Sequence, residues 1–302
     1  MKPADETRIH NPQSLCEIIC GDSREELKRL ESSVDLIVTS PPYADARKKH
    51  YDSVHPDKFV EWFLTFHDPF FKALTPDGSL VINIKDKVVN GQRHRYVWRT
   101  IDALCERGWF AIEDYIWHKT NPMPGNWPSR LRDGWEYCFH LSKVKRPYFN
   151  ADAVRQPIGD WVQSRLNKLG QNDLSRQNSA NASGFGRDIS RWVGNTTARP
   201  SNVISKALVG KNKGHPAVFP VDLPLFFIKL LTPENGLVVD PFGGSGTTGI
   251  AALSLGRQCI LIDNNQAYCL LAAERLKKEA IAAPSELKST VRRLRLVKAK
   301  TR

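Results

Sequence analysis

The stretch Leu237-Val-Val-Asp-Pro-Phe-Gly-Gly-Ser-Gly-Thr-Thr-Gly249 decides the fold of this chain of 302 residues. Its first three residues are apolar and, with Asp240, form a short stretch typical of a buried strand, and the glycines that follow have the spacing G-x-G-x-x-G. A helical pattern over 250–255 and a second strand over 259–263 come next. This order is typical of nucleotide-binding α/β proteins, in which glycines let a ligand approach the backbone closely.

Two acids indicate which nucleotide the loop suits. Asp240 stands directly beside the loop, where its charge would oppose a pyrophosphate. Asp263 ends the following strand, at the position where such folds hold ribose hydroxyls. A carboxylate at Asp240 suits a ligand with an ammonium or sulfonium group, as S-adenosylmethionine has. The alternative is a glycine-rich turn that only packs a helix against a strand.

The rest of the sheet must come from the N-terminal half, because only 39 residues follow Asp263. The two halves therefore stand in inverted order. Apolar runs predict strands over 16–20, 34–39, 79–84, 110–117 and 135–141. Strands that alternate with helices predict a mostly parallel α/β sheet. No helical pattern separates Trp117 from Trp135, so the last two strands are expected to form an antiparallel pair at the edge.

Three helices are expected between these strands, over 24–30, 56–74 and 96–107. Ser23 is the expected N-cap of the first helix, with Glu26 at the capping-box position. The second helix is expected to kink before Pro69, because proline cannot donate a hydrogen bond to the preceding turn.

A second motif, Ser40-Pro-Pro-Tyr43, stops the strand over 34–39 abruptly. Two successive prolines fix φ and lack N–H donors, so the chain leaves the sheet in a rigid, extended form. The loop presents a hydroxyl, carbonyl oxygens and an aromatic ring at the strand end where open α/β sheets place ligands. A planar base with an exocyclic amino group requires these groups, namely acceptors and a ring to stack on. A purely structural Pro-Pro turn is the alternative.

The net charge of +12 indicates a polyanionic partner. Between residues 143 and 215 the regular pattern fails, and 13 basic residues against four acids give this polar stretch +9. Residues 284–302 contain seven basic residues and one acid, which leaves −3 for the rest. Lys and Arg suit phosphates, whereas Arg, Asn and Gln suit base edges, so we interpret 143–215 as a nucleic-acid recognition region. A solvated excursion is the alternative there, and the basic tail is expected to be mobile.

Composition excludes several other classes of protein. A hydrophobic content of 41% with 25% charged residues is typical of a globular chain rather than a disordered one. No run approaches the ~18 apolar residues of a membrane span, and the first twenty residues lack a signal-peptide core. The six cysteines contain no C-x-x-C pair, so reduced core thiols are expected rather than a metal site or disulfides.

Together, Thr39-Ser-Pro-Pro-Tyr43 and Asp240-Pro-Phe-Gly-Gly-Ser-Gly-Thr-Thr248 resemble the motifs of a known family. These are the S-adenosylmethionine-dependent DNA amino-methyltransferases that modify N4 of cytosine or N6 of adenine, in their permuted beta class. The resemblance covers residues 16–276 and implies a Rossmann-like, seven-stranded, mostly parallel sheet with an antiparallel edge strand, S-adenosylmethionine as donor and duplex DNA as substrate. The implied regions are a catalytic half (1–142), a target-recognition insertion (143–212), a cofactor half (213–283) and a basic tail (284–302).

The resemblance also implies which residues form the site. Gly21-Asp22-Ser23 is similar to the family's adenine element, and the segment over 213–220 is similar to the part that closes over the cofactor. The implied catalytic residues are Ser40, Pro41, Pro42 and Tyr43. The implied cofactor-binding residues are Asp22, Thr39, His215, Phe219, Asp240, Pro241, Phe242, Gly243, Gly244, Ser245, Gly246, Thr247, Asp263 and Asn264. Expected DNA contacts are Arg47, Lys48, Lys49, Arg187 and Arg191, and no metal is required.

The implied reaction needs no nucleophilic side chain. Hydrogen bonds from the amino group to the Ser40 hydroxyl and the Pro41 carbonyl would expose the nitrogen lone pair for in-line attack, once the base has left the stack. Ser at the first position of the tetrapeptide mostly accompanies N4-cytosine methylation in this family, so cytosine is predicted. The alternatives are N6-adenine methylation, methylation of RNA or a protein amide, and a DNA-binding protein with a relic cofactor fold.

The resemblance further sets expectations about the setting in which the protein works. We expect a prokaryotic or phage-encoded protein of the cytoplasm, associated with the nucleoid and without a membrane partner. A cognate restriction endonuclease, as in a restriction-modification system, and a homodimer are both compatible with this expectation.

Overall fold

The computed structural model describes residues 16–45, 53–125, 127–159, 164, 168, 194–209, 219–282 and 294–298. The chain divides into two compact units, the first made of Met1–Asn150 with Asn202–Arg302 and the second of Ala151–Ser201. Within the described residues, the strands of the first unit's main sheet are β1 (Cys16–Cys20), β2 (Val34–Thr39), β3 (Leu74–Ile84), β6 (Phe110–Lys119), β7 (Trp135–Ser142), β10 (Val203–Lys206), β11 (Leu237–Asp240), β12 (Gln258–Asp263) and β13 (Leu294–Lys298).

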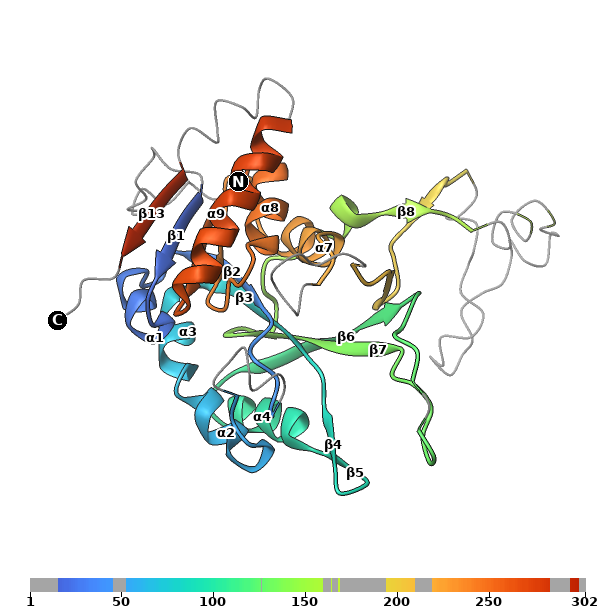
Figure 1. Cartoon of the computed structure of the whole chain (residues 1–302). Helices are drawn as coiled ribbons and strands as arrows, with labels where there is room; N and C mark the ends of the chain where they lie inside the picture. The colour runs from blue at the N-terminus through green and yellow to red at the C-terminus, as the bar shows by residue number, and fades with distance from the viewer. Residues whose placement is uncertain are drawn as a thin grey trace. The chain divides into compact units, whose positions relative to one another are not determined.

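These strands lie in the order β10-β6-β7-β3-β2-β11-β12-β1-β13 (Figure 1). Every neighbouring pair is parallel except the two pairs made by β7, which is antiparallel to β3 and to β6. The predicted mostly parallel α/β sheet is therefore confirmed. All seven expected strands are present, and the bounds of β1, β2 and β11 are those that their apolar runs predict.

Two features of the expected sheet are wrong. The sheet has nine strands among the described residues rather than seven, and its antiparallel strand lies inside it rather than at the edge. β10 covers β6 because Ile204, buried between exposed neighbours, pairs with Trp117. β13 lies within the tail that was expected to be mobile, and it pairs in parallel with β1. Its alternating Leu294-Arg-Leu296 pattern is the period of a strand.

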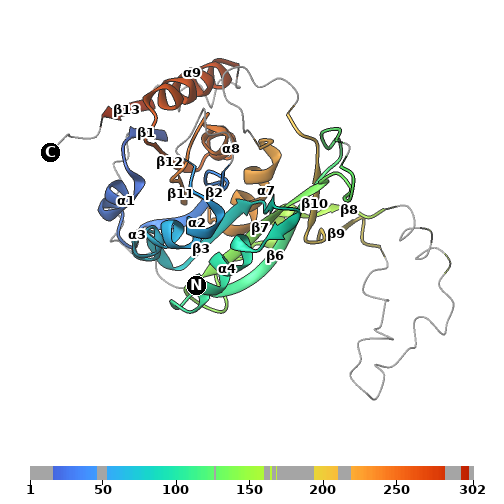
Figure 2. The ribbon, with the colours of Figure 1, turned by 60° about the horizontal axis from the view of Figure 1, so that its bottom comes forward.

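Helices cover both faces of the sheet (Figures 1 and 2). α2 (Pro56–Leu64), α3 (His67–Ala73) and α4 (Tyr96–Cys105) lie on one face, and α7 (Asp222–Leu231), α8 (Thr247–Ser254) and α9 (Gln266–Ala282) lie on the other. α1 (Ser23–Glu26) continues into a short 3-10 turn, Leu27–Arg29, after β1. The three layers bury the apolar residues of the central parallel strands on both sides, as in other α/β folds.

The helix expected over 56–74 is two helices, with the break at Thr65 and Phe66 rather than a kink inside one helix. Pro69 lies in the first turn of α3, where its missing N–H has no intrahelical partner to lose. The expected N-cap is also wrong. Asp22 caps α1, because its carboxylate accepts a hydrogen bond from the backbone N–H of Arg24 at 2.9 Å, and Ser23 is the first residue of the helix.

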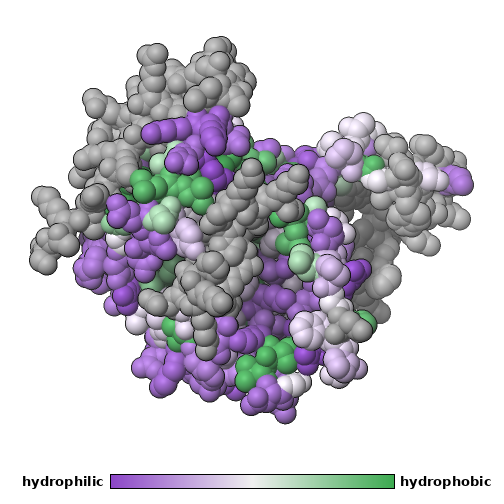
Figure 3. Space-filling model, in the orientation of Figure 1, coloured by the Kyte–Doolittle hydropathy of each residue, from purple (hydrophilic) through white to green (hydrophobic). Residues whose placement is uncertain are grey.

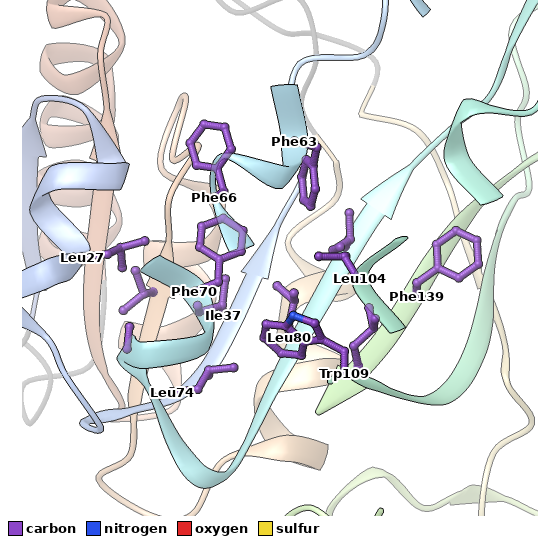
Figure 4. Packing of buried hydrophobic residues seen from close by; sticks show 14 of the residues in the cluster. Leu27, Ile37, Phe63, Phe66, Phe70, Leu74, Leu80, Leu104, Trp109 and Phe139 are labelled. Carbon is purple, nitrogen blue, oxygen red and sulfur yellow. The ribbon is translucent and has the colours of Figure 1, made fainter. Parts of the chain in front are cut away.

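The core between the sheet and helices α2, α3 and α4 is rich in aromatic rings (Figure 4). Phe63, Phe66 and Phe70 follow helical spacing and contact one another, with ring centroids 5.7 to 6.2 Å apart. They face Ile37 and Leu80 of the central strands. This packing fixes the ends of β2 and β3, and therefore the loops that leave them.

The described residues also form two smaller sheets of two strands each. The strands β4 (Lys87–Val89) and β5 (Gln92–His94) form a hairpin, and in the second unit β8 (Gln156–Pro157) pairs with β9 (Thr197–Ala198). The six cysteines form no disulfide bond with one another, and four of them are buried. The described residues contain neither a group of three or more metal-ligating side chains nor a helix long and apolar enough to cross a membrane. The residues that are coloured on the face drawn in Figure 3 are mostly hydrophilic, with hydrophobic ones in small patches.

Candidate active site

The two sequence motifs meet at one edge of the sheet. β2 and β11 are parallel neighbours, so the loop that follows Thr39 and the loop that follows Asp240 leave the sheet side by side. The hydroxyl of Thr39 donates a hydrogen bond of 2.6 Å to Oδ1 of Asp240. This contact spans 201 residues of sequence and ties the Ser40-Pro-Pro-Tyr43 loop to the glycine loop. Open α/β sheets bind ligands at this kind of edge.

Asp240 is the most enclosed acid of the site, with 2% of its surface exposed. Its Oδ2 accepts a hydrogen bond of 2.6 Å from the Thr248 hydroxyl. Its Oδ1, which is bound by Thr39, also accepts a hydrogen bond of 3.1 Å from the Phe242 N–H. Burial raises the pKa of Asp240 to about 6, and the nearby charge of Asp263 acts in the same direction. The carboxylate therefore joins β2, the glycine loop and α8, and a cation near it would stabilise its ionised form.

The glycine loop turns sharply and is held from two sides. Gly246 caps α8 with a φ of +82°, and a Cβ there would lie 3.0 Å from the Cβ of Ala272 in α9. The guanidinium of Arg275, also in α9, donates to the carbonyl and hydroxyl oxygens of Ser245 at 2.7 and 2.5 Å. Only glycine fits both the conformation and the close approach at residue 246. The loop is therefore fixed in shape before any ligand binds.

Asp263 lies across the glycine loop at the end of β12. Its two carboxylate oxygens accept hydrogen bonds from the backbone N–H groups of Gly244, at 2.9 Å, and Asn265, at 2.8 Å. Burial raises the pKa of Asp263, although it is less enclosed than Asp240. A carboxylate with one N–H on each oxygen retains lone pairs that can accept ligand hydroxyls. The acid thus has the geometry expected of a group that holds a ribose.

Asp22 reaches the same region from the end of β1. Its carboxylate is bound by the guanidinium of Arg24, with Nε 3.0 Å from both oxygens, and this lowers the pKa of Asp22. The Arg24 guanidinium also lies over the ring of Phe66, 5.4 Å from its centroid. Phe66 packs edge to face on Phe242 of the glycine loop, 5.1 Å away. Asp22 and Phe242 are thereby linked through one arginine and one phenylalanine.

The catalytic loop is held through the hydroxyl of Tyr43. This hydroxyl donates to Oε2 of Glu136 at 2.7 Å, lies 3.3 Å from Oδ1 of Asn83, and accepts from the Ser40 hydroxyl, also at 3.3 Å. Burial and the charge of Glu136 raise the pKa of Tyr43 well above its ordinary value, so its hydroxyl remains a donor. Because Ser40 gives its hydrogen to Tyr43, its oxygen lone pairs remain available to accept an amino N–H.

Glu136 in turn forms a buried ion pair with Lys119. The two side chains come from the neighbouring strands β6 and β7, and each is only 9% exposed. The Lys119 ammonium lies 5.1 Å from the centre of the Trp117 ring. The sequence does not indicate Asn83, Lys119 or Glu136 as residues of the site. Each is a polar residue within or at the end of a strand, and this pattern does not say which loop the side chain supports.

The structure brings most of the expected site residues together. Thr39, the catalytic tetrapeptide and the run from Asp240 to Thr247 lie on the two adjoining loops, with Asp22 and Asp263 beside them. Phe219 is partly buried just before α7, and Asn264 is exposed after β12. Six expected site residues lie outside the described residues: Arg47, Lys48, Lys49, Arg187, Arg191 and His215.

Comparison with known proteins identifies the family. The model of the DNA methylase family N6_N4_Mtase matches residues 34–274, so the chain belongs to this family of DNA methylases. The Type II methyltransferase M.PvuII of Proteus hauseri is 30% identical over 275 residues, which cover 84% of this chain and 82% of the relative.

Two solved structures show the same fold. A PvuII DNA methyltransferase described as cytosine-N4-specific superimposes with a TM-score of 0.67 at 26% identity, and the match covers 94% of this chain and 95% of the other. The M1.HpyAVI–SAM complex superimposes with a TM-score of 0.54 at 25% identity, covering 86% and 99%. The chain is therefore a methyltransferase that acts on DNA.

Proposed function

We propose that this enzyme transfers a methyl group from S-adenosylmethionine to the exocyclic N4 of cytosine in duplex DNA. The observation that carries the proposal is the position of the Ser40 hydroxyl, which is held by Tyr43 on a rigid loop directly beside the Asp240 glycine loop. The choice of N4-cytosine is supported by the serine at residue 40 and by the likeness to the cytosine-N4-specific PvuII enzyme.

The residues of the glycine loop fit S-adenosylmethionine. Two carboxylates line this loop, and Asp263 lies close enough to Asp240 for its charge to raise the pKa of Asp240, which suits a ligand that carries positive charge and ribose hydroxyls. When bound, S-adenosylmethionine supplies an activated methyl group. The described residues contribute the rest. Asp263 binds hydroxyls, Gly246 lets the loop pass close to α9, and Arg24, which binds Asp22, packs on the Phe66 ring that supports Phe242.

The catalytic loop orients the amino group of the base. In our proposal the Ser40 hydroxyl oxygen and the Pro41 carbonyl oxygen each accept one amino N–H, which draws the nitrogen lone pair out of conjugation with the ring. The Tyr43 ring stacks on the extruded base and replaces the stacking lost from the duplex. Orientation of this kind accounts for ~7–11 kcal/mol in well-placed reactions.

We further propose how the regions of the chain divide this work. Residues 1–142 form the catalytic half, 213–283 the cofactor half and 284–302 a basic tail, in the permuted order of the beta class. The insertion over 143–212 carries the charge of a DNA-reading region, with Arg187 and Arg191 as contacts there and Arg47, Lys48 and Lys49 beside the catalytic loop. His215 and Phe219 belong to the segment that closes over the cofactor.

The same comparisons support a proposal about the setting in which the enzyme works. We propose that it acts in the cytoplasm on nucleoid DNA and protects sites against a cognate restriction endonuclease, since its relatives are named Type II methyltransferases. A homodimer is compatible with this function. Light scattering of the purified protein would measure its oligomeric state, and a search for site-specific cleavage in the source cells would test for the nuclease.

The direct test is to express the protein in cells without DNA methylation, digest the DNA to nucleosides and identify the methylated base. We expect N4-methylcytosine, and N6-methyladenine alone would contradict the choice of base. Sequencing of the same DNA gives the recognition site.

Two variants test the assignment of roles. Ser40→Ala is expected to reduce turnover by at least about 100-fold with little change in cofactor affinity, whereas Asp263→Ala is expected to weaken cofactor binding first. Calorimetry and a methyl-transfer assay separate the two effects. Equal losses of cofactor affinity in both variants would contradict this division of roles.

A further inference from the structure

The loop over 120–134, which joins β6 to β7, leaves the sheet at the same edge as the catalytic loop. β2 is parallel to β3, and β7 is antiparallel to both β3 and β6, so β6 runs parallel to β2. Lys119 therefore ends its strand at the same edge of the sheet as Ser40. The N–H of Lys119 donates to the Gly134 carbonyl at 2.7 Å and closes the base of the loop. Glu136, two residues further on, is the residue that binds Tyr43.

This loop and the first residue of β7 carry an unusual concentration of exposed apolar side chains. Met123, Trp127, Leu131 and Trp135 are 73%, 54%, 90% and 41% exposed. They are four of the nine large hydrophobic side chains that are exposed among the described residues, although they fall within 13 positions. Exposed apolar side chains gathered on one loop indicate a surface that binds something.

Charge at the tip of the loop indicates what is bound. Leu131, the most exposed of the four, stands between Arg130 and Arg132. The acid that follows, Asp133, is already paired with Lys85 at 2.7 Å and with Arg93 at 2.5 Å. An apolar side chain flanked by two guanidinium groups is suited to duplex DNA, whose phosphates lie on the outside and whose base faces, which are apolar, are stacked inside.

Local contacts brace the tip. Trp127 forms a β-bridge with Arg130, whose guanidinium lies 5.9 Å from the centre of the Trp127 ring. Arg130 also donates to the carbonyl oxygen of Gly91, in the turn between β4 and β5, at 3.5 Å. The exposed position of Leu131 is therefore built into the loop and supported by a neighbouring hairpin.

We infer that Leu131 is a wedge that enters the DNA stack beside the target base, with Arg130 and Arg132 on the flanking phosphates. This inference rests on the proposed function, since a base must leave the duplex before the catalytic loop can act on it. Apolar side chains placed between base steps unstack them. β6 lies three strand spacings, about 14 Å, from β2, so the tip meets the duplex beside the catalytic loop rather than within it.

The test compares two substrates that differ only in the cost of extrusion. Both are duplexes that contain the mapped recognition site, one with the target cytosine paired to guanine and one with it opposite an abasic position. Leu131→Ser is expected to slow single-turnover methylation of the paired duplex by at least about tenfold and to change the rate on the abasic duplex by less than about threefold. The matched control is Leu270→Ser, which removes an exposed leucine from α9 and should change neither rate.

Four outcomes would overturn the inference. Equal losses on both duplexes would assign Leu131 to a step other than extrusion, and no loss on either would leave it without a role. Conversion of a dimer to a monomer by Leu131→Ser, seen by light scattering, would make the tip an interface between two copies of the chain. A wild-type protein that methylates neither duplex would instead contradict the proposed function, and the wedge with it.

Discussion

At the scale of single residues, the buried pair of Lys119 and Glu136 gives the clearest stability prediction. Glu136→Leu leaves the Lys119 ammonium buried without its partner and is expected to lower the free energy of unfolding by about 3–5 kcal/mol. The double variant Lys119→Met/Glu136→Leu removes both charges, so it should recover most of this loss. Urea unfolding of Glu136→Leu, Lys119→Met and the double variant measures the coupling.

The control for this cycle is an exposed pair on α2. Lys58 and Glu61 lie 3.5 Å apart with more than two thirds of each side chain exposed, so Glu61→Leu should cost less than about 1 kcal/mol. If Glu136→Leu and the double variant were equally destabilised, the buried charge of Lys119 would not be the cause.

Asp240 predicts a dependence of stability on pH with a definite sign. The folded protein raises the pKa of Asp240 to about 6, from 3.8, so between these values the folded state binds a proton that the unfolded state has lost. The favourable contribution of this group is therefore complete below pH 4 and is lost as the pH rises to 6, by up to about 3 kcal/mol. Relative to Asp240→Asn, the wild type should lose stability over this interval and remain level above it.

Urea unfolding at a series of pH values, without ligand, measures this difference. Asp102→Asn, which replaces an exposed acid on α4, controls for the removal of a carboxylate as such. A wild type whose stability relative to Asp240→Asn rises between pH 4 and 6 would show that the hydrogen bonds from Thr39 and Thr248 outweigh burial.

At the scale of elements, the turn into α8 depends on Gly246. Gly246→Ala places a side chain in the left-handed region and sets its Cβ 3.0 Å from that of Ala272, so we expect a loss of at least about 1–2 kcal/mol in unfolding free energy and weaker cofactor binding. Gly256→Ala is the matched control, because residue 256 also has a positive φ, of +65°, but nothing within 4 Å. Thermal unfolding measures the loss of stability in both variants, and calorimetry measures their cofactor affinity. The difference between the two variants separates the effect of the close contact with Ala272 from the cost of a side chain at positive φ. Equal losses would show that the approach of α9 has no effect.

The sequence predicts the elements that carry strong local patterns. β2 and β11 have the expected bounds, because each is a short, mostly apolar and fully buried run that ends at a proline or a glycine loop. β10 was missed because only Ile204 of its four residues is buried, which leaves no apolar run to recognise. α1 begins at Ser23, one residue earlier than expected, and its N-cap is Asp22 rather than Ser23. The Asp22 carboxylate is held by both the backbone N–H and the guanidinium of Arg24.

In the candidate site, too, the sequence predicts the residues that belong to a local motif and not those that are distant in sequence. Ser40 and Tyr43 were selected because the motif lies within four consecutive residues. The partners of Tyr43 lie 40 and 93 positions away, at Asn83 and Glu136, and they meet it only because the sheet places β2, β3 and β7 side by side. Local patterns do not specify such contacts, because the order of strands in a sheet is set by packing of the whole chain.

At the scale of the whole molecule, the uneven charge predicts how DNA binding responds to salt. The stretch over 143–215 carries +9 of the net +12, so the phosphate contacts are expected to be concentrated there. Arg187→Ala/Arg191→Ala should weaken binding to DNA of any sequence and reduce the slope of log affinity against log salt by about 2, with cofactor affinity unchanged.

Fluorescence anisotropy of a labelled duplex at several salt concentrations measures that slope. The control is Lys277→Ala/Lys278→Ala, which removes the same charge from exposed positions on α9 and should leave the slope within about 0.5 of the wild type. If both double variants reduced the slope equally, DNA would be responding to the total charge of the molecule. A reduction confined to the Arg187 and Arg191 variant would instead assign DNA contact to the insertion, because only charges that displace counterions from phosphates change the slope.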